Sequence, residues 1–207
     1  MNIFIKICGI TSIEDANVAV ALGADAIGLI RYPQSPRYIE DKELDQIYKA
    51  LPKSVKVVPV FANEVAEEVQ RVLNKMPGAI PQFHGDEDPT YCESFGIKYI
   101  KAINMDINID LKEEAEKYIS SLALLLDSKE ADFLGGTGLT FDWNLVSSIT
   151  NKPLILAGGL NSENIEEAIS SGHYWGVDVS SGVESLPGKK DKSKINNFIN
   201  IIRDKDE

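Results

Sequence analysis

The sequence has few cysteines and no uninterrupted apolar run of the length that crosses a membrane. Among its 207 residues only Cys8 and Cys92 carry thiols, so there is no disulfide framework, and a reducing cytoplasm is the expected location. No apolar run reaches the roughly 18 residues of a transmembrane helix. The first residues have no basic segment before a long apolar core, so we expect no secretion signal.

Positive charge is also scarce. The formal net charge is −11, which argues against nucleic acid or an anionic membrane as a partner. No group of His, Cys or carboxylate residues has metal-ligand spacing, and no dinucleotide fingerprint is present. We expect no metal and no nucleotide cofactor. If the ligand is an anion, local hydrogen-bond donors must overcome a repulsive overall field.

Short apolar runs alternate with segments long enough for a helix, at a mean spacing of about 25 residues, which is typical of parallel βα units. Eight such units in 207 residues predict one α/β domain over residues 1–207, a (β/α)8 barrel. An open doubly wound sheet is the alternative, although such sheets usually stop at five or six strands. The polar segment Asn104–Asp110 is ambiguous. The predicted strands are Ile3–Cys8, Ala24–Ile30, Val55–Phe61, Ala79–Phe83, Ile97–Ala102, Leu122–Leu126, Pro153–Ala157 and Gly176–Ser180.

Helix signals lie between several of these runs. Thr11–Glu14 has the pattern of a capping box, and Gly23 stands where a helix end favours a residue without a Cβ atom. Apolar residues at helical spacing predict helices over Glu64–Leu73, Asn161–Ile169 and Lys194–Ile202.

The residues that end the strands of such a barrel form its active site. Cys8 ends the first strand, and Asp127 follows the very apolar sixth strand. A carboxyl group there should be partly desolvated, which favours the protonated acid. A thiol and a carboxyl across one barrel mouth can act as base and acid in a proton-transfer isomerisation. Alternatively, Cys8 is a small core residue and Asp127 caps a turn.

A base at Cys8 must be a thiolate, and an unperturbed thiol is only about 3% ionised at neutral pH. Strand alternation places Lys6 on the same face as Cys8, and Asp178 faces inward from the last strand. We expect Lys6 and Asp178 to pair inside the barrel, and we expect the Lys6 charge to favour the Cys8 thiolate.

Glycine- and serine-rich turns follow the seventh and eighth strands, where this barrel usually binds phosphate through backbone N–H groups. The predicted phosphate-binding residues are Gly158, Gly159, Ser180, Ser181 and Gly182. Such donors need no net positive charge, which suits an acidic protein. The alternative is that these are two ordinary tight turns.

Three further segments are candidates. Arg37 lies in a proline-stiffened loop and can hold a ligand carboxylate with two parallel hydrogen bonds, or else form a surface ion pair. His84 ends the fourth strand and can be a proton partner, a ligand donor or a structural histidine. Gly135–Gly138 suits a lid or a long turn. The loop at Arg31–Gln34 has no assigned role.

The sequence resembles the phosphoribosylanthranilate isomerases of tryptophan biosynthesis, in motifs that occur in order over almost the whole chain. The resemblance implies that Cys8 is the general base, Asp127 the general acid and Arg37 the residue that holds the anthranilate carboxylate. We also predict that His84 and Asp178 bind substrate. Arg31-Tyr32 and Phe83 depart from the usual pattern without touching the acid–base pair. The matching segments are Lys6–Thr11, Ser35–Ile39, Phe83–Glu87, Gly135–Gly138, Leu156–Leu160 and Val177–Glu184.

The implied reaction is the Amadori rearrangement of N-(5′-phosphoribosyl)anthranilate, a phosphorylated sugar–anthranilate, to 1-(2-carboxyphenylamino)-1-deoxyribulose 5-phosphate. It requires no cofactor, and a homo-oligomer is left open. Two alternatives remain. A barrel isomerase of a phosphoribosyl-imidazole substrate is expected to use two aspartates, against which Cys8 speaks. A non-catalytic phosphate-binding barrel would leave the acid–base pair unexplained.

Overall fold

Eight parallel strands close into a barrel in the computed structural model, which describes residues 3–106, 108–128, 143, 146 and 152–206. The first and last strands are hydrogen-bonded neighbours, with Lys6 opposite Asp178 in register. A closed sheet excludes the open doubly wound alternative and confirms the predicted (β/α)8 architecture. The strands are β1 Phe4–Ile7, β2 Ala26–Ile30, β3 Lys56–Phe61, β4 Gln82–Phe83, β5 Ile100–Met105, β6 Ala123–Ser128, β7 Leu154–Leu156 and β8 Gly176–Val179.

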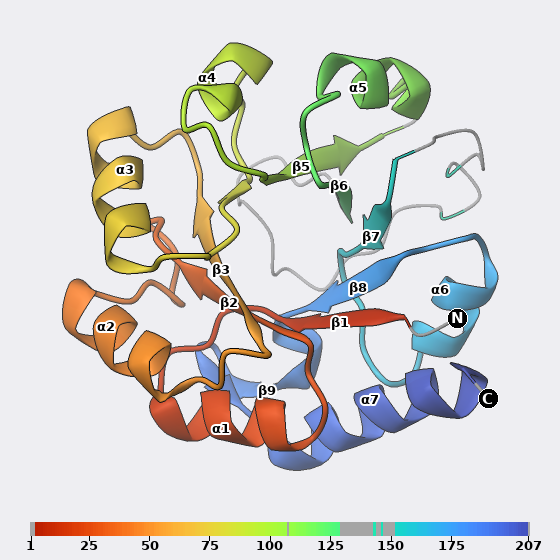
Figure 1. The fold of residues 1–207 in the computed structure, drawn as a ribbon. Helices are drawn as coiled ribbons and strands as arrows, with labels where there is room; N and C mark the ends of the chain where they lie inside the picture. Colours follow the sequence, from red (N-terminus) through yellow and green to blue (C-terminus); the bar gives the residue numbers. More distant parts are fainter. Residues whose placement is uncertain (1–2, 107, 129–142, 144–145, 147–151, 207) are drawn as a thin grey trace.

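Helices surround the barrel on its outer side (Figure 1). They cover the outward-facing apolar side chains of the strands, as parallel sheets require. A 3-10 turn at Ser181–Val183 and a two-stranded hairpin, β9 Glu184–Leu186 and β10 Lys189–Lys190, follow β8. The helices are α1 Ile13–Ala21, α2 Asp41–Ala50, α3 Ala66–Lys75, α4 Pro89–Glu93, α5 Leu111–Lys117, α6 Ile165–Ser170 and α7 Lys192–Asp206.

The core has two parts because strand side chains alternate between the two faces. The larger part lies between the sheet and the helices and includes Ile5, Ile7, Val177 and Val179. The smaller part fills the barrel with compact residues such as Ala26, Val58, Ala102 and Ala123. The inward positions nearest the strand ends carry Cys8, Gln82 and Asp178 instead, so the polar groups of the barrel gather at one mouth.

Local structure differs from the sequence prediction at several boundaries. The N-cap of α1 is Ser12, whose Oγ accepts a hydrogen bond from Asp15 N at 3.1 Å. The predicted capping box at Thr11–Glu14 was therefore one residue too early. Thr11 Oγ1 instead donates to Gly188 O at 2.6 Å. Gly23, with φ of 104°, follows the end of α1 as predicted.

Two strands begin three residues after the start of their apolar runs. β4 is limited to Gln82–Phe83, whereas the run suggested a start at Ala79. β5 continues to Met105 through the ambiguous segment, because Ile103 and Met105 are buried on one face of the strand. Within the described residues, no helix combines the length and apolarity that crossing a membrane requires.

Candidate active site

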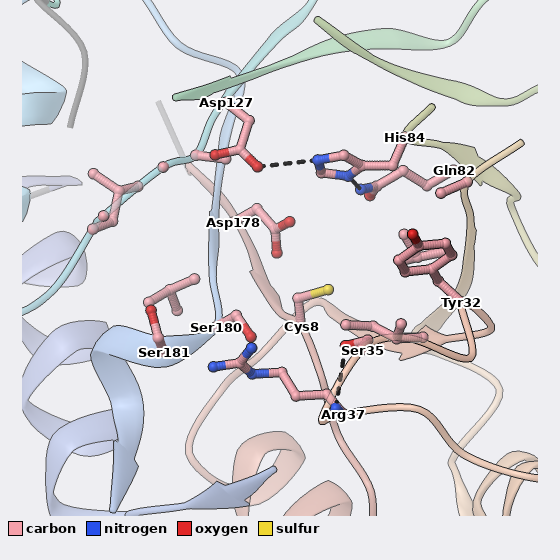
Figure 2. Close-up of a pocket in the computed structure, with 18 residues that line it drawn as sticks. Cys8, Tyr32, Ser35, Arg37, Gln82, His84, Asp127, Asp178, Ser180 and Ser181 are labelled. Carbon is pink, nitrogen blue, oxygen red and sulfur yellow. Dashed lines mark hydrogen bonds and ion pairs between the residues drawn. The ribbon is translucent and has the colours of Figure 1, made fainter. Parts of the chain in front are cut away.

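A pocket lies at the C-terminal ends of the barrel strands and contains most of the predicted site residues (Figure 2). Residues contribute from the ends of β1 to β4 and β6 to β8. The predicted residues that line it are Cys8, Arg37, His84, Asp127, Gly158, Gly159, Asp178, Ser180 and Ser181. Gly182 lies beside it, where a Cβ atom would come within 1.9 Å of Leu160 O. The close approach of these two turns thus requires glycine at position 182.

Cys8 follows β1 directly, and its buried thiol occupies the space above Gly28 of β2. A Cβ atom at Gly28 would lie 2.6 Å from Cys8 Sγ and 3.0 Å from Cys8 Cα. Burial raises the pKa of the Cys8 thiol, while the positive charge of Lys6 opposes this effect. The pKa of Cys8 is raised overall, although Lys6 favours the thiolate as expected. Desolvation of the thiolate outweighs the nearby ammonium in the unliganded pocket.

The predicted pair of Lys6 and Asp178 is confirmed. Lys6 Nζ donates to Asp178 Oδ2 at 2.7 Å, and both residues are buried. Burial disfavours the Lys6 ammonium, yet the charges of Asp178 and Cys8 more than offset this, so the pKa of Lys6 is raised. Asp178 Oδ1 is buried and has no hydrogen-bond partner in the part of the chain that the structure describes. Because Asp178 lines the pocket, this oxygen is an acceptor available to a ligand hydroxyl.

Asp127 is held on both carboxyl oxygens. Oδ1 accepts from Ser128 N at 2.8 Å, and Oδ2 lies 3.0 Å from His84 Nε2. The other ring nitrogen of His84, Nδ1, lies 2.8 Å from Gln82 Nε2. Figure 2 shows these three side chains in a row along one wall of the pocket, opposite Arg37. His84 therefore contacts the candidate acid directly, while Gln82 was not foreseen from the sequence.

Arg37 is buried rather than on the surface, and its guanidinium already holds a carboxylate. Nε donates to Glu184 Oε1 at 2.9 Å and Nη2 to Oε2 at 2.8 Å. Lys190 Nζ also donates to Glu184 Oε1 at 2.8 Å and to Ser180 O at 3.1 Å. The alternative of a surface ion pair is therefore wrong in its location, because the ion pair of Arg37 with Glu184 is buried. These two bonds use the Nε–Nη2 edge of the guanidinium, and no described residue accepts a hydrogen bond from Nη1.

The turns after β7 and β8 contain the donors predicted for phosphate. Gly158 and Gly159 have φ of 77° and 64°, a left-handed conformation that glycine adopts without strain. Ser180 Oγ is buried without a partner among the described residues. Ser180 lies close to Arg37, since a Cβ atom at Gly9 would come 2.8 Å from Ser180 Oγ and 2.6 Å from Arg37 Cδ. Gly158 lies on the Asp127 side of the pocket, where its Cβ atom would come 2.9 Å from Asp127 Oδ1.

An apolar wall was missed by sequence reasoning. Ile30, Val60 and Ala62 line the pocket from the ends of β2 and β3, and Tyr32 and Ser35 line it from the loop after β2. Inward alternation along β2 and β3 could have identified the first two. The loop at Arg31–Gln34, which had no assigned role, therefore contributes Tyr32 to the pocket.

Arg31 faces away from the pocket. Its Nη2 donates to Asp41 Oδ1 at 3.0 Å and Glu68 Oε1 at 3.1 Å, on α2 and α3. The predicted lid at Gly135–Gly138 lies outside the described residues. Among the residues that are described, no group of three or more His, Cys, Asp or Glu side chains is arranged to hold a metal ion.

Comparison with known proteins adds independent information. Residues 5–201 match the family model described as N-(5′-phosphoribosyl)anthranilate (PRA) isomerase. A protein of that name from Neisseria meningitidis is 47% identical over 194 residues, which cover 94% of this chain and 93% of the relative. The solved phosphoribosyl anthranilate isomerase of Thermotoga maritima has a TM-score of 0.89 and 39% identity, covering 98% of this chain and 99% of its own.

A further solved structure is described as such an isomerase in complex with reduced 1-(o-carboxyphenylamino)-1-deoxyribulose 5-phosphate. It has a TM-score of 0.86 and 38% identity to this chain, covering 98% of this chain and 99% of its own.

Proposed function

The chain belongs to the N-(5′-phosphoribosyl)anthranilate isomerase family, and we propose that it catalyses the family's Amadori rearrangement in tryptophan biosynthesis, with Cys8 as general base and Asp127 as general acid. The observation that carries this proposal is the presence of both groups, buried, in one pocket. The same pocket has donors for two anions, and the substrate carries a carboxylate and a phosphate.

The pocket offers a distinct place for each part of this substrate. The anthranilate carboxylate is received by the Nη1–Nη2 edge of Arg37, with the aromatic ring against Tyr32 and the apolar wall. The phosphate is received by the turns at Gly158–Gly159 and Ser180–Gly182. The bound compound in the solved relative has the same two anionic groups on a deoxyribulose. The ribose then lies between Cys8 and Asp127.

The reaction moves protons and electron pairs only. Asp127 donates a proton to the ribose ring oxygen, the bond from C1′ to that oxygen breaks, and the nitrogen lone pair forms a protonated Schiff base. The Cys8 thiolate removes the C2′ proton, and the released pair forms the double bond between C1′ and C2′ while the imine pair returns to nitrogen. The product of this step is an enolamine.

Tautomerisation completes the sequence. The 2′-hydroxyl loses its proton and C1′ gains one, which gives the ketone. Asp127, now a carboxylate, can accept the hydroxyl proton, and the Cys8 thiol can supply the proton to C1′. Both groups then return to their starting states. Each acid–base group is expected to contribute on the order of 10²–10⁴-fold to the rate.

Asp178 and Lys6 support this chemistry from inside the barrel. The unpartnered Oδ1 of Asp178 is suited to accept a hydrogen bond from a ribose hydroxyl. The charge of Lys6 offsets that of Asp178 through the 2.7 Å ion pair, so the carboxylate adds less repulsion against a thiolate at Cys8.

A fluorescence assay tests the proposed function. N-(5′-phosphoribosyl)anthranilate is formed in place from anthranilate and phosphoribosyl pyrophosphate by the preceding transferase, and we expect its fluorescence to disappear when the protein is added. A phosphoribosyl-imidazole isomerase or a non-catalytic phosphate-binding barrel would leave the signal unchanged. Protein carrying both Cys8→Ser and Asp127→Asn is the control for binding without turnover.

A further inference from the structure

His84 stands between Gln82 and Asp127 with both ring nitrogens in hydrogen-bond contact. Gln82 and His84 are two residues apart along β4 and its end, so they face the same side. The distances are 2.8 Å from Gln82 Nε2 to Nδ1 and 3.0 Å from Nε2 to Asp127 Oδ2. All three residues are buried, with exposed fractions of 0% for Gln82, 8% for His84 and 5% for Asp127. Solvent therefore has little access to these two contacts.

The backbone on either side of His84 is fixed from outside the barrel. The buried Lys101 Nζ donates to Phe83 O at 3.2 Å and to Gly85 O at 2.6 Å, the two carbonyls that flank His84. The same ammonium lies 3.2 Å from Glu87 Oε2. These two bonds fix the backbone that carries His84, and the contacts of its ring nitrogens with Gln82 and Asp127 hold the imidazole.

The position of the ring proton follows from the neighbours. Gln82 directs its amide nitrogen at Nδ1, while its Oε1 is buried without a partner among the described residues. An amide nitrogen only donates, so in this arrangement Nδ1 is the acceptor and the neutral ring carries its proton on Nε2. That N–H then donates to Asp127 Oδ2. A donor directed at a carboxyl group favours its ionised form, which is the form that Asp127 reaches when it has given its proton to the substrate.

We propose that His84 and Gln82 are positioning residues for the general acid: Gln82 fixes the Nε2–H tautomer of His84, and His84 orients Asp127 and stabilises the carboxylate formed in the transition state. This inference rests on the proposed function, because it assumes that Asp127 is the acid. It gives His84 a role toward Asp127 in place of the predicted contact with substrate. Oδ1 of Asp127 accepts one hydrogen bond from Ser128 N, and Oδ2 accepts one from His84 Nε2. Each oxygen keeps a second lone pair that can carry the transferred proton.

The tautomer can be observed directly, without any assay of activity. The chain has only two histidines, so ¹⁵N-histidine NMR of the whole protein gives two ring systems, and exposed His173 is an internal control. We expect His84 in the unliganded protein at neutral pH to have protonated Nε2 and unprotonated Nδ1. Gln82→Met, similar in length but without a donor, should increase the Nδ1–H form and leave His173 unchanged. The opposite tautomer in the unchanged protein, or no response to Gln82→Met, would overturn the inference.

A pair of His84 variants separates positioning of the acid from general support of the fold. In His84→Gln the amide nitrogen can still donate to Asp127 near the place of Nε2, whereas His84→Met fills similar space without a donor. We expect His84→Met to lower kcat by about 10- to 100-fold with KM within about twofold, the effect of losing a charge-assisted hydrogen bond. His84→Gln should recover about tenfold of that loss. Equal kcat values in the two folded variants would contradict the proposal.

Failure of the acid role itself would look different. If Asp127→Asn kept full turnover while NMR showed the expected tautomer, the proposed function of Asp127 would be wrong and the arrangement of His84 would still hold. If Asp127→Asn lost turnover while His84→Met kept it, the acid role would hold and the positioning role would be wrong.

Discussion

Lys6 Nζ lies 2.7 Å from Asp178 Oδ2, and the two residues stand opposite each other in register on β1 and β8. Cys8 follows two residues after Lys6 on the same face of the chain. The thiol therefore has a buried cation and a buried anion as its nearest charges, and both act on its pKa in opposite directions. The pair places charge near the base without giving the barrel interior a net charge.

Replacing Lys6 with Met should raise the pKa of the Cys8 thiol further, because the favourable charge is lost while Asp178 remains. The measurement is the pH dependence of alkylation by iodoacetamide in a Cys92→Ser background, where Cys8 is the only thiol. An unchanged thiol pKa would rule out the influence of Lys6. The same variant should lose about 3–5 kcal/mol of unfolding free energy, since it leaves a buried carboxylate unpaired. Adding Asp178→Asn should restore much of that loss.

The raised pKa of Cys8 predicts a pH dependence with a definite sign. The buried thiol is protonated at neutral pH in the unliganded protein, so alkylation should increase with pH and have its midpoint above that of a free thiol. The folded state binds this proton more tightly than the unfolded state does. Cys8 thus contributes stability below the unfolded thiol pKa, which is lost as the pH rises through the folded pKa. Urea unfolding between pH 7 and 10 should show a steeper loss of stability in the unchanged protein than in Cys8→Ser, because Cys92, whose pKa is also raised by burial, contributes equally to both. Parallel curves would contradict it.

Much of the fold follows from the sequence because each strand is a short Val-, Ile- or Leu-rich run that must be buried on both sides. Strand alternation alone placed Lys6 opposite Asp178. The capping residue of α1 was missed by one position, because Thr11 and Ser12 are both good caps and only the observed bond from Asp15 N to Ser12 Oγ decides between them. The end of β5 was missed because Asn104 interrupts a strand that Met105 continues.

Residues that line the pocket could be predicted from their position at the strand ends. Contacts between residues far apart in the sequence could not. Cys8 follows β1 and Asp127 lies near the end of β6, so the sequence could predict that both line the pocket. Glu184 is separated by 147 residues from Arg37, and no local pattern indicates that it occupies part of the guanidinium fork. The expected effect of Lys6 on the Cys8 thiol is present, but the raised pKa was not predicted, because a sequence identifies the neighbouring Lys6 and not the degree of burial, which has the larger effect here.

Gly28→Ala should displace the base. The new methyl group would lie 2.6 Å from Cys8 Sγ and 3.0 Å from its Cα, so the thiol must move from its place. We expect kcat to fall at least about tenfold, because catalytic geometry tolerates little misplacement. The control is Gly78→Ala, where no heavy atom of the described chain lies within 4 Å but φ is 88°. That variant should lose stability and keep kcat; an unaltered kcat in Gly28→Ala would show that the thiol position is not critical.

Arg37→Met should act mainly on substrate binding. Loss of the charge-assisted bonds to a substrate carboxylate should raise KM by about 10- to 100-fold, with a smaller change in kcat. Arg71→Met is the matched control, since Arg71 forms its ion pairs with Glu68 and Asp41 outside the pocket. We expect KM to stay within about twofold in that variant. If steady-state kinetics showed the same KM for Arg37→Met as for the unchanged protein, Arg37 would not bind the substrate carboxylate.

The acid–base assignment is tested most directly by the turnover numbers of Cys8→Ser and Asp127→Asn, each measured by the loss of substrate fluorescence. A serine hydroxyl is too weak an acid to supply the base, and an asparagine amide N–H is too weak an acid to transfer its proton to the ring oxygen. We predict that each variant folds, keeps KM within a few-fold and loses at least about two decades of kcat. Full turnover in either variant would contradict the role given to that residue.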